Sequence, residues 1–558
     1  MICLGIEGTA EKTGIGIVDS DGKILGIAGK PMLPEKGGIH PREASEHHSY
    51  WIPKLVNQVT EESHISLNEV DLISFSIGPG LGPALRTVAT SARTLSLGLN
   101  IPIVGVNHCV GHIEIGKLDT GAINPLTLYV SGGNSQLIGF ESEKYRIFGE
   151  TLDIAIGNCF DHFGREIGLK HPAGSIIEKL AKKGNYMELP YTVKGMDFSF
   201  SGLLSAAVRS FQKGFNIEDI CYSLQETAFS MLVEVAERGL SNTKNDELMV
   251  CGGVAANKRL SEMLSIMACE HYTNFYIPEM RLCGDNGAMI AWLGILMYTH
   301  FGAVDLSSTS VIPKYRSDEV NAPWVRQKSS FLNIPKDILN KGAEANIYSS
   351  HWMDEIAIKK NRIAKSYRIE ELDNKLRERR TKNEAKLLSY TKTLGIRTPI
   401  LYDIDLGNKS IVMEHLEDTL LKDVLNDLNK TFTDFKSSKK LSIIFKNIGE
   451  AIAILHNGNI VHGDLTSSNI FLDENFNPIL IDFGLGKFSD LLEDKITDIM
   501  VFKKSLKSID DFVDKGLFDI FLNGYYIKTK DNINNINNKM IEIQRRGRYT
   551  QFKDTHFK

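Results

Sequence analysis

Several features that define other protein classes are missing from this chain of 558 residues. It contains no run of about 18 apolar residues, which excludes a membrane-spanning helix. Residues 1–7 lack the basic segment of a signal peptide, so we expect them to form a first strand. All seven cysteines precede residue 330, and none forms a Cys-x-x-Cys pair. This pattern excludes a disulfide framework and indicates buried thiols in a cytoplasmic protein without a membrane partner.

The chain does contain enough apolar material for more than one core. Hydrophobic residues make up 42% and charged residues 24% of the sequence, as in globular proteins, and the length favours at least two domains. The formal net charge of −5 does not by itself indicate a nucleic-acid partner. The composition changes near residues 315–340, where glycine and cysteine give way to lysine, asparagine and isoleucine. We therefore predict a domain over residues 1–322, a linker over 323–340 and a second domain over 341–558.

The first of these regions repeats a pattern of strand, glycine-containing turn and strand. It occurs over residues 4–18 and again over 126–140, and a third glycine turn at Gly252 and Gly253 joins a strand to a helix. Because glycine has no Cβ, the backbone of such turns can approach a phosphate group. Ordinary hairpins are the alternative. Duplicated halves separated by helices nevertheless favour a two-lobed α/β fold with a nucleotide in the cleft, and helical spacing is found over residues 83–99, 223–240 and 256–270.

A pair of histidines, His108 and His112, lies at positions i and i+4. On a helix this spacing places both imidazoles on one face, where they could bind a single metal ion, although solvent-facing histidines also occur at this spacing. No glutamate follows His108, so the zinc-protease pattern is absent. Asp285 is a candidate third ligand from a distant strand end. Its alternative role is to cap the helix predicted to begin near residue 287.

Together with the histidine pair, four segments resemble the universal family that forms threonylcarbamoyladenosine in tRNA. They are Gly5–Ala10, Tyr129–Asn134, His171–Glu178 and Gly252–Asn257. The resemblance spans about residues 1–322. It implies an actin/hexokinase-like ATPase fold with duplicated ribonuclease-H-like lobes and one iron or zinc ion. It also implies transfer of threonylcarbamoyl from threonylcarbamoyl-AMP to the exocyclic amine of adenosine 37 in tRNAs that read ANN codons.

The same resemblance implies roles for individual residues. The metal would be held by His108, His112 and Asp285, with Tyr129 beside it. The adenylate would be contacted by Glu7, Tyr129, Val130, Ser131, Gly132, Gly133, Asn134, Asp161, Gly174, Glu178 and Asn257. The acyl group of such a substrate is already activated, so the protein has mainly to position two substrates and polarise one oxygen. No arrangement of serine or cysteine with histidine demands a covalent intermediate.

A second set of motifs, typical of phosphoryl transfer, follows in the order found in protein kinases. Asp464 would orient the acceptor hydroxyl, and Asn469 and Asp482 would hold Mg²⁺ bound to ATP. Lys359 ends a β-type run and would pair with Glu384, although the adjacent Lys360 is an alternative. The loop that covers the phosphates would consist of Gly342, Ala343, Glu344 and Ala345.

This second region also departs from ordinary kinases. Gly463 replaces the usual arginine before Asp464, and no Ala-Pro-Glu motif follows Asp482. Over residues 341–549 it resembles the small bilobal α+β atypical serine/threonine kinase of the KEOPS complex. Joined to the first region, it resembles an archaeal fusion. The resemblance implies an ATPase or autophosphorylating kinase that regulates or supports the modification enzyme. It implies tRNA, other KEOPS subunits and a threonylcarbamoyl-AMP synthase as partners.

Two further interpretations remain open from the sequence. The basic and aromatic tail over residues 544–553 could bind RNA or the first domain, or could be a solvated terminus. The whole chain could instead be an actin-like chaperone ATPase switched by its kinase, a metalloprotease or a sugar kinase. The chaperone and sugar-kinase alternatives give the histidine pair no role, and the metalloprotease lacks its glutamate.

Overall fold

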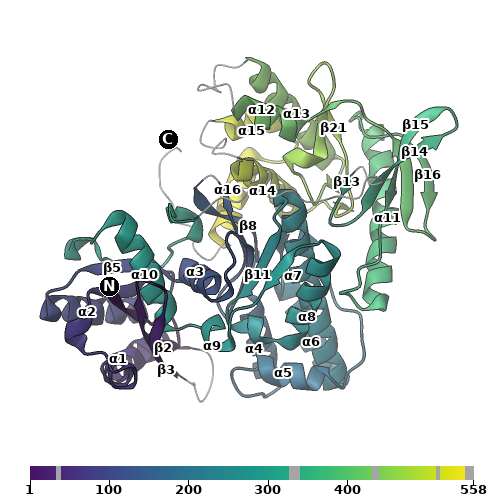
Figure 1. Cartoon of the computed structure of the whole chain (residues 1–558). Helices are drawn as coiled ribbons and strands as arrows, with labels where there is room; N and C mark the ends of the chain where they lie inside the picture. Colours follow the sequence, from purple (N-terminus) through teal and green to yellow (C-terminus); the bar gives the residue numbers. More distant parts are fainter. Residues whose placement is uncertain (33–38, 142, 326–339, 430–438, 510–515, 547–558) are drawn as a thin grey trace.

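The structure is a computed structural model that describes residues 1–32, 39–141, 143–325, 340–429, 439–509 and 516–546 (Figure 1). Most of the predicted linker over 323–340 and of the basic tail over 544–553 lies outside these ranges. The domain limits at 322 and 341 therefore stay predictions. None of the described helices combines the length and the apolar character needed to cross a membrane.

The first lobe is a five-stranded sheet with strand order β3-β2-β1-β4-β5. Its strands are β1 (Ile2–Glu7), β2 (Lys12–Asp19), β3 (Ile24–Pro31), β4 (Leu72–Gly78) and β5 (Ile103–Asn107). The first three are antiparallel, and β4 and β5 add in parallel. Helices α1 (Pro41–Ser63) and α2 (Gly82–Leu99) contact the sheet, as do α3 (His108–Thr120) and α10 (Gly287–Phe301). A Cβ on Gly5 would stand 2.2 Å from the Gly287 carbonyl oxygen, so glycine is what lets α10 lie directly on β1.

The second lobe repeats the strand order of the first, β8-β7-β6-β11-β12. Its strands are β6 (Leu126–Val130), β7 (Ser135–Glu141), β8 (Lys144–Glu150), β11 (Glu247–Cys251) and β12 (Asn274–Tyr276). Again an antiparallel trio is extended by two parallel strands. Its other elements are α4 (Ile156–Glu166), α5 (Gly174–Ala181), β9 (Val193–Lys194), β10 (Asp197–Phe198), α6 (Ser201–Gln212), α7 (Ile217–Thr243), α8 (Lys258–Glu270) and α9 (Met280–Cys283). The repetition confirms the duplicated, two-lobed α/β fold predicted from the glycine turns.

The remainder of the chain forms a small bilobal α+β unit. Its antiparallel sheet consists of β13 (Asn340–Lys341), β14 (Asn346–Trp352), β15 (Glu355–Asn361), β17 (Ser410–Glu414) and β16 (Leu401–Asp405), with α11 (Glu370–Thr393). The helical half contains α12 (Leu421–Asn429), α13 (Lys439–Asn457), α14 (Leu492–Ile509), α15 (Leu517–Lys528) and α16 (Ile533–Arg546). Short strands connect these helices: β18 (Thr419–Leu420), β19 (Ile460–Val461), β20 (Ile470–Leu472), β21 (Pro478–Leu480) and β22 (Lys487–Phe488). This arrangement agrees with the kinase-like fold predicted for it.

The two units meet through the second lobe, and in Figure 1 α11 lies beside α7. Much of the contact is ionic. Lys194 lies 3.0 Å from Asp494, and Lys504 lies 2.6 Å from Asp197. The Gly195 amide also donates to the carbonyl oxygen of Gly463, at 2.9 Å. This last contact touches the catalytic loop predicted around Asp464, so the interface reaches the second candidate site.

Candidate metal centre and phosphoryl-transfer site

The two histidines owe their position to the start of α3. The Asn107 side chain accepts hydrogen bonds from the backbone N–H groups of Cys109 and Val110, at 2.9 and 3.1 Å. This cap fixes His108 as the first helical residue and places His112 one turn later on the same face. Both side chains are buried, with 5% and 1% of their surface exposed.

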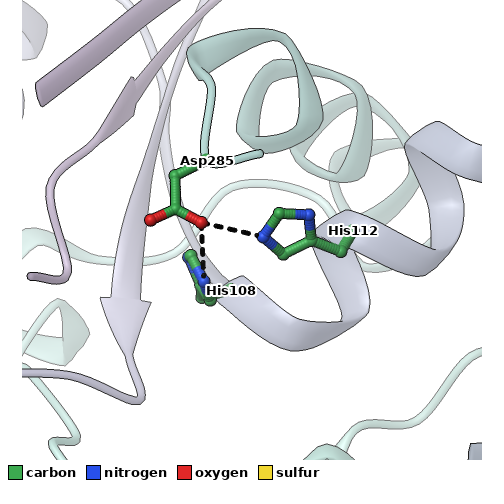
Figure 2. A group of neighbouring side chains, drawn as sticks. All are labelled: His108, His112 and Asp285. Carbon is green, nitrogen blue, oxygen red and sulfur yellow. Dashed lines mark hydrogen bonds and ion pairs between the residues drawn. The ribbon is translucent and has the colours of Figure 1, made fainter. Parts of the chain in front are cut away.

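Asp285 reaches the same place from the segment before α10. The capping role considered for it belongs instead to Asn286, whose side-chain oxygen accepts from the backbone N–H of Met289 at 3.0 Å. The Asp285 carboxylate is thus left to face the histidines (Figure 2). Its Oδ1 lies 3.0 Å from His112 Nε2 and 3.5 Å from His108 Nε2.

These three residues fit the metal that the resemblance implies. One ligand atom from each lies within 4.8 Å of the others, and two imidazoles with one carboxylate are a donor set typical of zinc or iron. The Tyr129 ring lies 5.1 Å from the His112 ring. The Tyr129 hydroxyl is buried without a hydrogen-bond partner among the described residues, so a polar group is also available beside the ligands.

Carboxylates set the charge of the histidine pair. Burial lowers the pKa of His108, but the charges of Glu7 and Asp285 outweigh it and raise that pKa to about 9. Burial lowers the pKa of His112, and its hydrogen bond to Asp285 opposes this only in part. Burial raises the pKa of Asp285, yet the two histidines hold it well below its usual range. Without metal, the pair therefore carries its proton on His108.

Glu7, predicted to bind substrate, has a different immediate neighbour. Its carboxylate is fully buried and lies 3.1 Å from His108 Nδ1. The same carboxylate accepts from the Thr9 amide at 2.8 Å and from the Thr9 hydroxyl at 2.7 Å. A carboxylate on the far nitrogen of a ligand histidine orients the ring toward its metal. Glu7, at the end of β1, thus supports the metal centre from the side of His108 that faces away from Asp285.

Backbone amides at or beside three helix starts contact three of the residues predicted to bind the adenylate. The Gly157 amide at the start of α4 donates to Ser131, the Asp161 carboxylate accepts from the Ala173 amide at 2.7 Å, and Glu178 accepts from the Lys258 amide. Gly132 and Gly174 have no atom within 4 Å of where a Cβ would stand, which leaves the backbone uncovered.

The other predicted adenylate contacts differ in how they can act. Asn257 caps α8 and donates to Gln225 of α7 at 3.1 Å. Asn134 is buried, and its amide donates to the Ser131 hydroxyl at 3.0 Å, which closes the turn that contains Gly133. The Val130 side chain is fully buried in the core, so only its backbone could reach a ligand.

The second candidate site centres on a lysine of β15, and the direction of the side chains in this strand determines which of two adjacent lysines it is. Lys360 lies 2.8 Å from Glu384 and 2.7 Å from Asp482. The prediction that Lys359 pairs with Glu384 is therefore wrong. Successive side chains of a strand point to opposite faces, and in β15 it is Lys360 that faces inward. Asn469 donates to the Asp464 carbonyl oxygen at 2.8 Å, which holds the catalytic loop closed.

The departures of this site from ordinary kinases have a structural reason. Gly463 adopts φ +80°, and a Cβ there would stand 2.3 Å from the Leu485 carbonyl oxygen, so the usual arginine cannot be accommodated. The glycine-poor loop closes through a hydrogen bond from the Gly342 amide to the Ala345 carbonyl oxygen at 3.1 Å. This loop places Glu344 near Arg362, with 3.8 Å between Glu344 Oε2 and Arg362 Nη2.

Two residues of α7 that contact the kinase-like unit, Glu234 and Arg238, escaped prediction from the sequence. Glu234 accepts from Arg368 at 2.6 Å and from Arg380 at 2.9 Å. Arg238 lies 3.0 Å from the Asp464 carboxylate. A partial signal was present, because these charges lie within the apolar period of residues 223–240, but their partners lie more than a hundred positions downstream.

Comparisons with known proteins agree with this geometry. A family model described as tRNA N6-adenosine threonylcarbamoyltransferase matches residues 25–292, and a protein kinase domain model matches residues 340–501. Each relative named next is a probable bifunctional tRNA threonylcarbamoyladenosine biosynthesis protein. The one from Methanobrevibacter smithii is 60% identical over 99% of both chains. That from Methanothermobacter thermautotrophicus is 53% identical, and that from Methanocaldococcus jannaschii 50%, each over 99% of this chain and all of the relative. The chain therefore belongs to the archaeal family of bifunctional tRNA threonylcarbamoyladenosine biosynthesis proteins, with a transferase domain followed by a protein kinase domain.

Proposed function

We propose that the transferase domain moves threonylcarbamoyl from threonylcarbamoyl-AMP to the exocyclic amine of adenosine 37 in tRNAs that read ANN codons. The observation that carries this proposal is the convergence of His108, His112 and Asp285 in the same fold as uncovered glycine turns. Burial first, and then the Asp285 and Asp161 charges, raise the pKa of Glu11 to about 7. The charges of Asp285, a proposed metal ligand, and Asp161, a proposed adenylate contact, thus both act on Glu11.

The reaction forms a carbon–nitrogen bond and breaks a carbon–oxygen bond and an N–H bond. The amine nitrogen attacks the carbamoyl carbon, the bond from that carbon to the phosphate oxygen of AMP breaks, and an amine proton is released. His108, His112 and Asp285 would hold an iron or zinc ion, which would supply Lewis-acid chemistry when bound. Glu7 holds the far side of His108 and so orients its Nε2. The uncovered backbone at Gly132 leaves room for the phosphate group.

We propose further that the kinase domain binds ATP with Mg²⁺ and transfers its γ-phosphate. Lys360 would contact the phosphates, Asn469 and Asp482 would hold the metal ions, and Asp464 would orient the attacking oxygen. Glu384 positions Lys360 from α11. Through this activity the domain would regulate or support the transferase in the cytoplasm. The partners would be the other KEOPS subunits and a threonylcarbamoyl-AMP synthase.

Mass spectrometry of tRNA nucleosides tests the division of labour between the two domains. The full chain is incubated with threonylcarbamoyl-AMP, tRNA and the KEOPS subunits, and ATP turnover is measured in parallel. His108→Ala should abolish the modified nucleoside and leave ATP turnover intact. Asp464→Asn should abolish ATP turnover. His162→Ala, which changes a histidine with 48% of its side chain exposed, is the matched control and should retain both activities. Modification by His108→Ala at the wild-type rate would contradict the metal role.

A further inference from the structure

One side chain of the transferase domain lies inside the phosphoryl-transfer site of the kinase domain. Arg238, near the C-terminal end of α7, has only 10% of its side chain exposed. Its Nη1 lies 3.0 Å from Asp464 Oδ2, and its Nη2 contacts Glu344 of the phosphate-covering loop. The two ends of one guanidinium therefore connect the catalytic loop to the loop above the phosphates.

Arg238 lies between the two loops that would surround the ATP phosphates. Asp464 and Glu344 flank the guanidinium directly, and the Arg238 charge helps to lower the pKa of Asp482 after the larger effects of Lys360 and Arg362. In kinases the γ-phosphate lies among these same elements. An arginine fork matches two phosphate oxygens as well as it matches two carboxylates. ATP would thus replace Glu344 as a partner of Arg238.

Neutralising Glu234 does not require Arg238. Glu234 already pairs with Arg368 at 2.6 Å and Arg380 at 2.9 Å, whereas Arg238 contacts it only through Nε at 3.2 Å. This contact holds the base of the guanidinium and leaves both terminal nitrogens directed at Asp464 and Glu344 of the kinase domain. Such a fixed orientation is what electrostatic stabilisation of a transition state requires.

We propose that Arg238 is a catalytic residue of the kinase site supplied by the transferase domain. Its guanidinium contacts the γ-phosphate of ATP and stabilises the charge on the transferring group during hydrolysis. A water oxygen bonds to the γ-phosphorus, the bond to the β–γ bridging oxygen breaks, and ADP leaves with the electron pair. The water proton passes to phosphate or solvent. This inference rests on the proposed ATP site of the kinase domain.

Water suits this site because the transferase domain covers the approach to Asp464. The Gly195 amide donates to the Gly463 carbonyl oxygen, and a Cβ on Gly195 would stand 3.3 Å from Asp464 Oδ1. A protein segment carrying a hydroxyl acceptor would have to displace this strand connection, whereas water would not. Arg238 and Gly195 together therefore favour hydrolysis over transfer to protein.

Steady-state ATP hydrolysis by the full chain with Mg²⁺ tests the proposal. Arginines supplied to phosphoryl transfer contribute on the order of 10³–10⁵ to kcat. We expect Arg238→Ala to lower kcat by at least about 100-fold, with little change in the KM for ATP, and added methylguanidinium to restore part of the rate. Arg238→Lys should not rescue, because a lysine lacks the fork. Lys194→Ala removes another ion pair of the same interface and should hydrolyse ATP normally.

A second measurement separates catalysis from folding. Arg238→Ala should weaken binding of ADP with aluminium fluoride, which mimics the transferring phosphate, far more than binding of ADP alone. Hydrolysis by Arg238→Ala at the wild-type rate or faster would show that Arg238 only blocks the cleft and would overturn the proposal, as would an equal loss in Lys194→Ala. Hydrolysis that persists in Lys360→Ala would instead remove the ATP site itself, and the inference with it.

Discussion

At the scale of single residues, the structure assigns different roles to adjacent residues that the sequence does not distinguish. Asp285 and Asn286 both precede α10, and either could cap it. Asn286 does so, and Asp285 is left to face the two histidines. That the two histidines share one face was predictable, because residues four apart lie on the same side of a helix. Which of Lys359 and Lys360 faces inward was not predictable, because the order of polar and apolar residues in β15 does not determine which face of the strand is buried.

Metal binding should release about one proton near pH 7. The pKa of metal-free His108 is raised to about 9, so its proton is bound below that pH, whereas the pKa of His112 is lowered and its ring is neutral. The ion must displace the His108 proton, so affinity should rise about tenfold per pH unit up to about pH 9 and then level off. Calorimetry of zinc binding in buffers with different ionisation enthalpies counts the proton. Glu7→Gln should reduce the number released, and equal release by both proteins would contradict this assignment.

The two lysines of β15 should differ sharply in function. Lys360 contacts Glu384 and Asp482, whereas Lys359 lies on the other face of the strand. We expect Lys360→Ala to reduce ATP hydrolysis at least about 100-fold and Lys359→Ala to stay within about twofold of wild type. Phosphate release under saturating Mg²⁺ and ATP measures both. The reverse ranking of the two variants would restore Lys359 as the catalytic lysine.

At the scale of elements, α7 serves three regions at once. Gln225 reaches Asn257 in the predicted adenylate site, Glu226 pairs with Arg259 at 2.8 Å, and Glu234 enters the kinase domain. The apolar period of residues 223–240 predicted this helix correctly. It could not predict that a helix of this kind buries charges, because two arginines that neutralise Glu234 come from the other domain, Arg380 from α11 and Arg368 from the segment just before it.

Removing the Glu234 charge should destabilise the domain interface strongly. Glu234→Gln would remove the carboxylate that Arg368 and Arg380 share and leave these buried arginines, among the described residues, only Asp373 and Glu344 as counter-ions. Breaking one side of a buried ion pair costs about 3–5 kcal/mol. Lys375→Ala is the matched control, because its pair with Glu188 is exposed and should be worth less than about 1 kcal/mol. Chemical unfolding of both variants measures the difference. Similar unfolding curves would show that the buried cluster contributes little.

At the scale of the whole molecule, sequence predicted the parts better than their assembly. The repeated order of strands and glycine turns is a local pattern and could therefore be predicted from the sequence, and both sheets follow it. The interface is built from single charges far apart in the chain, such as Lys504 with Asp197 and Lys365 with Glu237. No periodicity marks such pairs. The pair of Lys365 with Glu237 is buried on both sides, so we expect it to help hold the two units together.

The two domains should therefore remain together after the chain between them is cut. A protease site placed within residues 326–339 would sever the connection but leave Glu234, Glu237 and their cations in contact. Because these pairs are buried, salt screens them weakly, and we expect the halves to co-elute in gel filtration at 0.15 M and at 0.5 M NaCl. Glu234→Gln combined with Lys365→Met should separate them after cleavage, whereas Lys375→Ala should not. Dissociation of the cleaved wild-type protein in 0.15 M salt would show that the linker, rather than the buried charges of α7, holds the kinase site against the transferase.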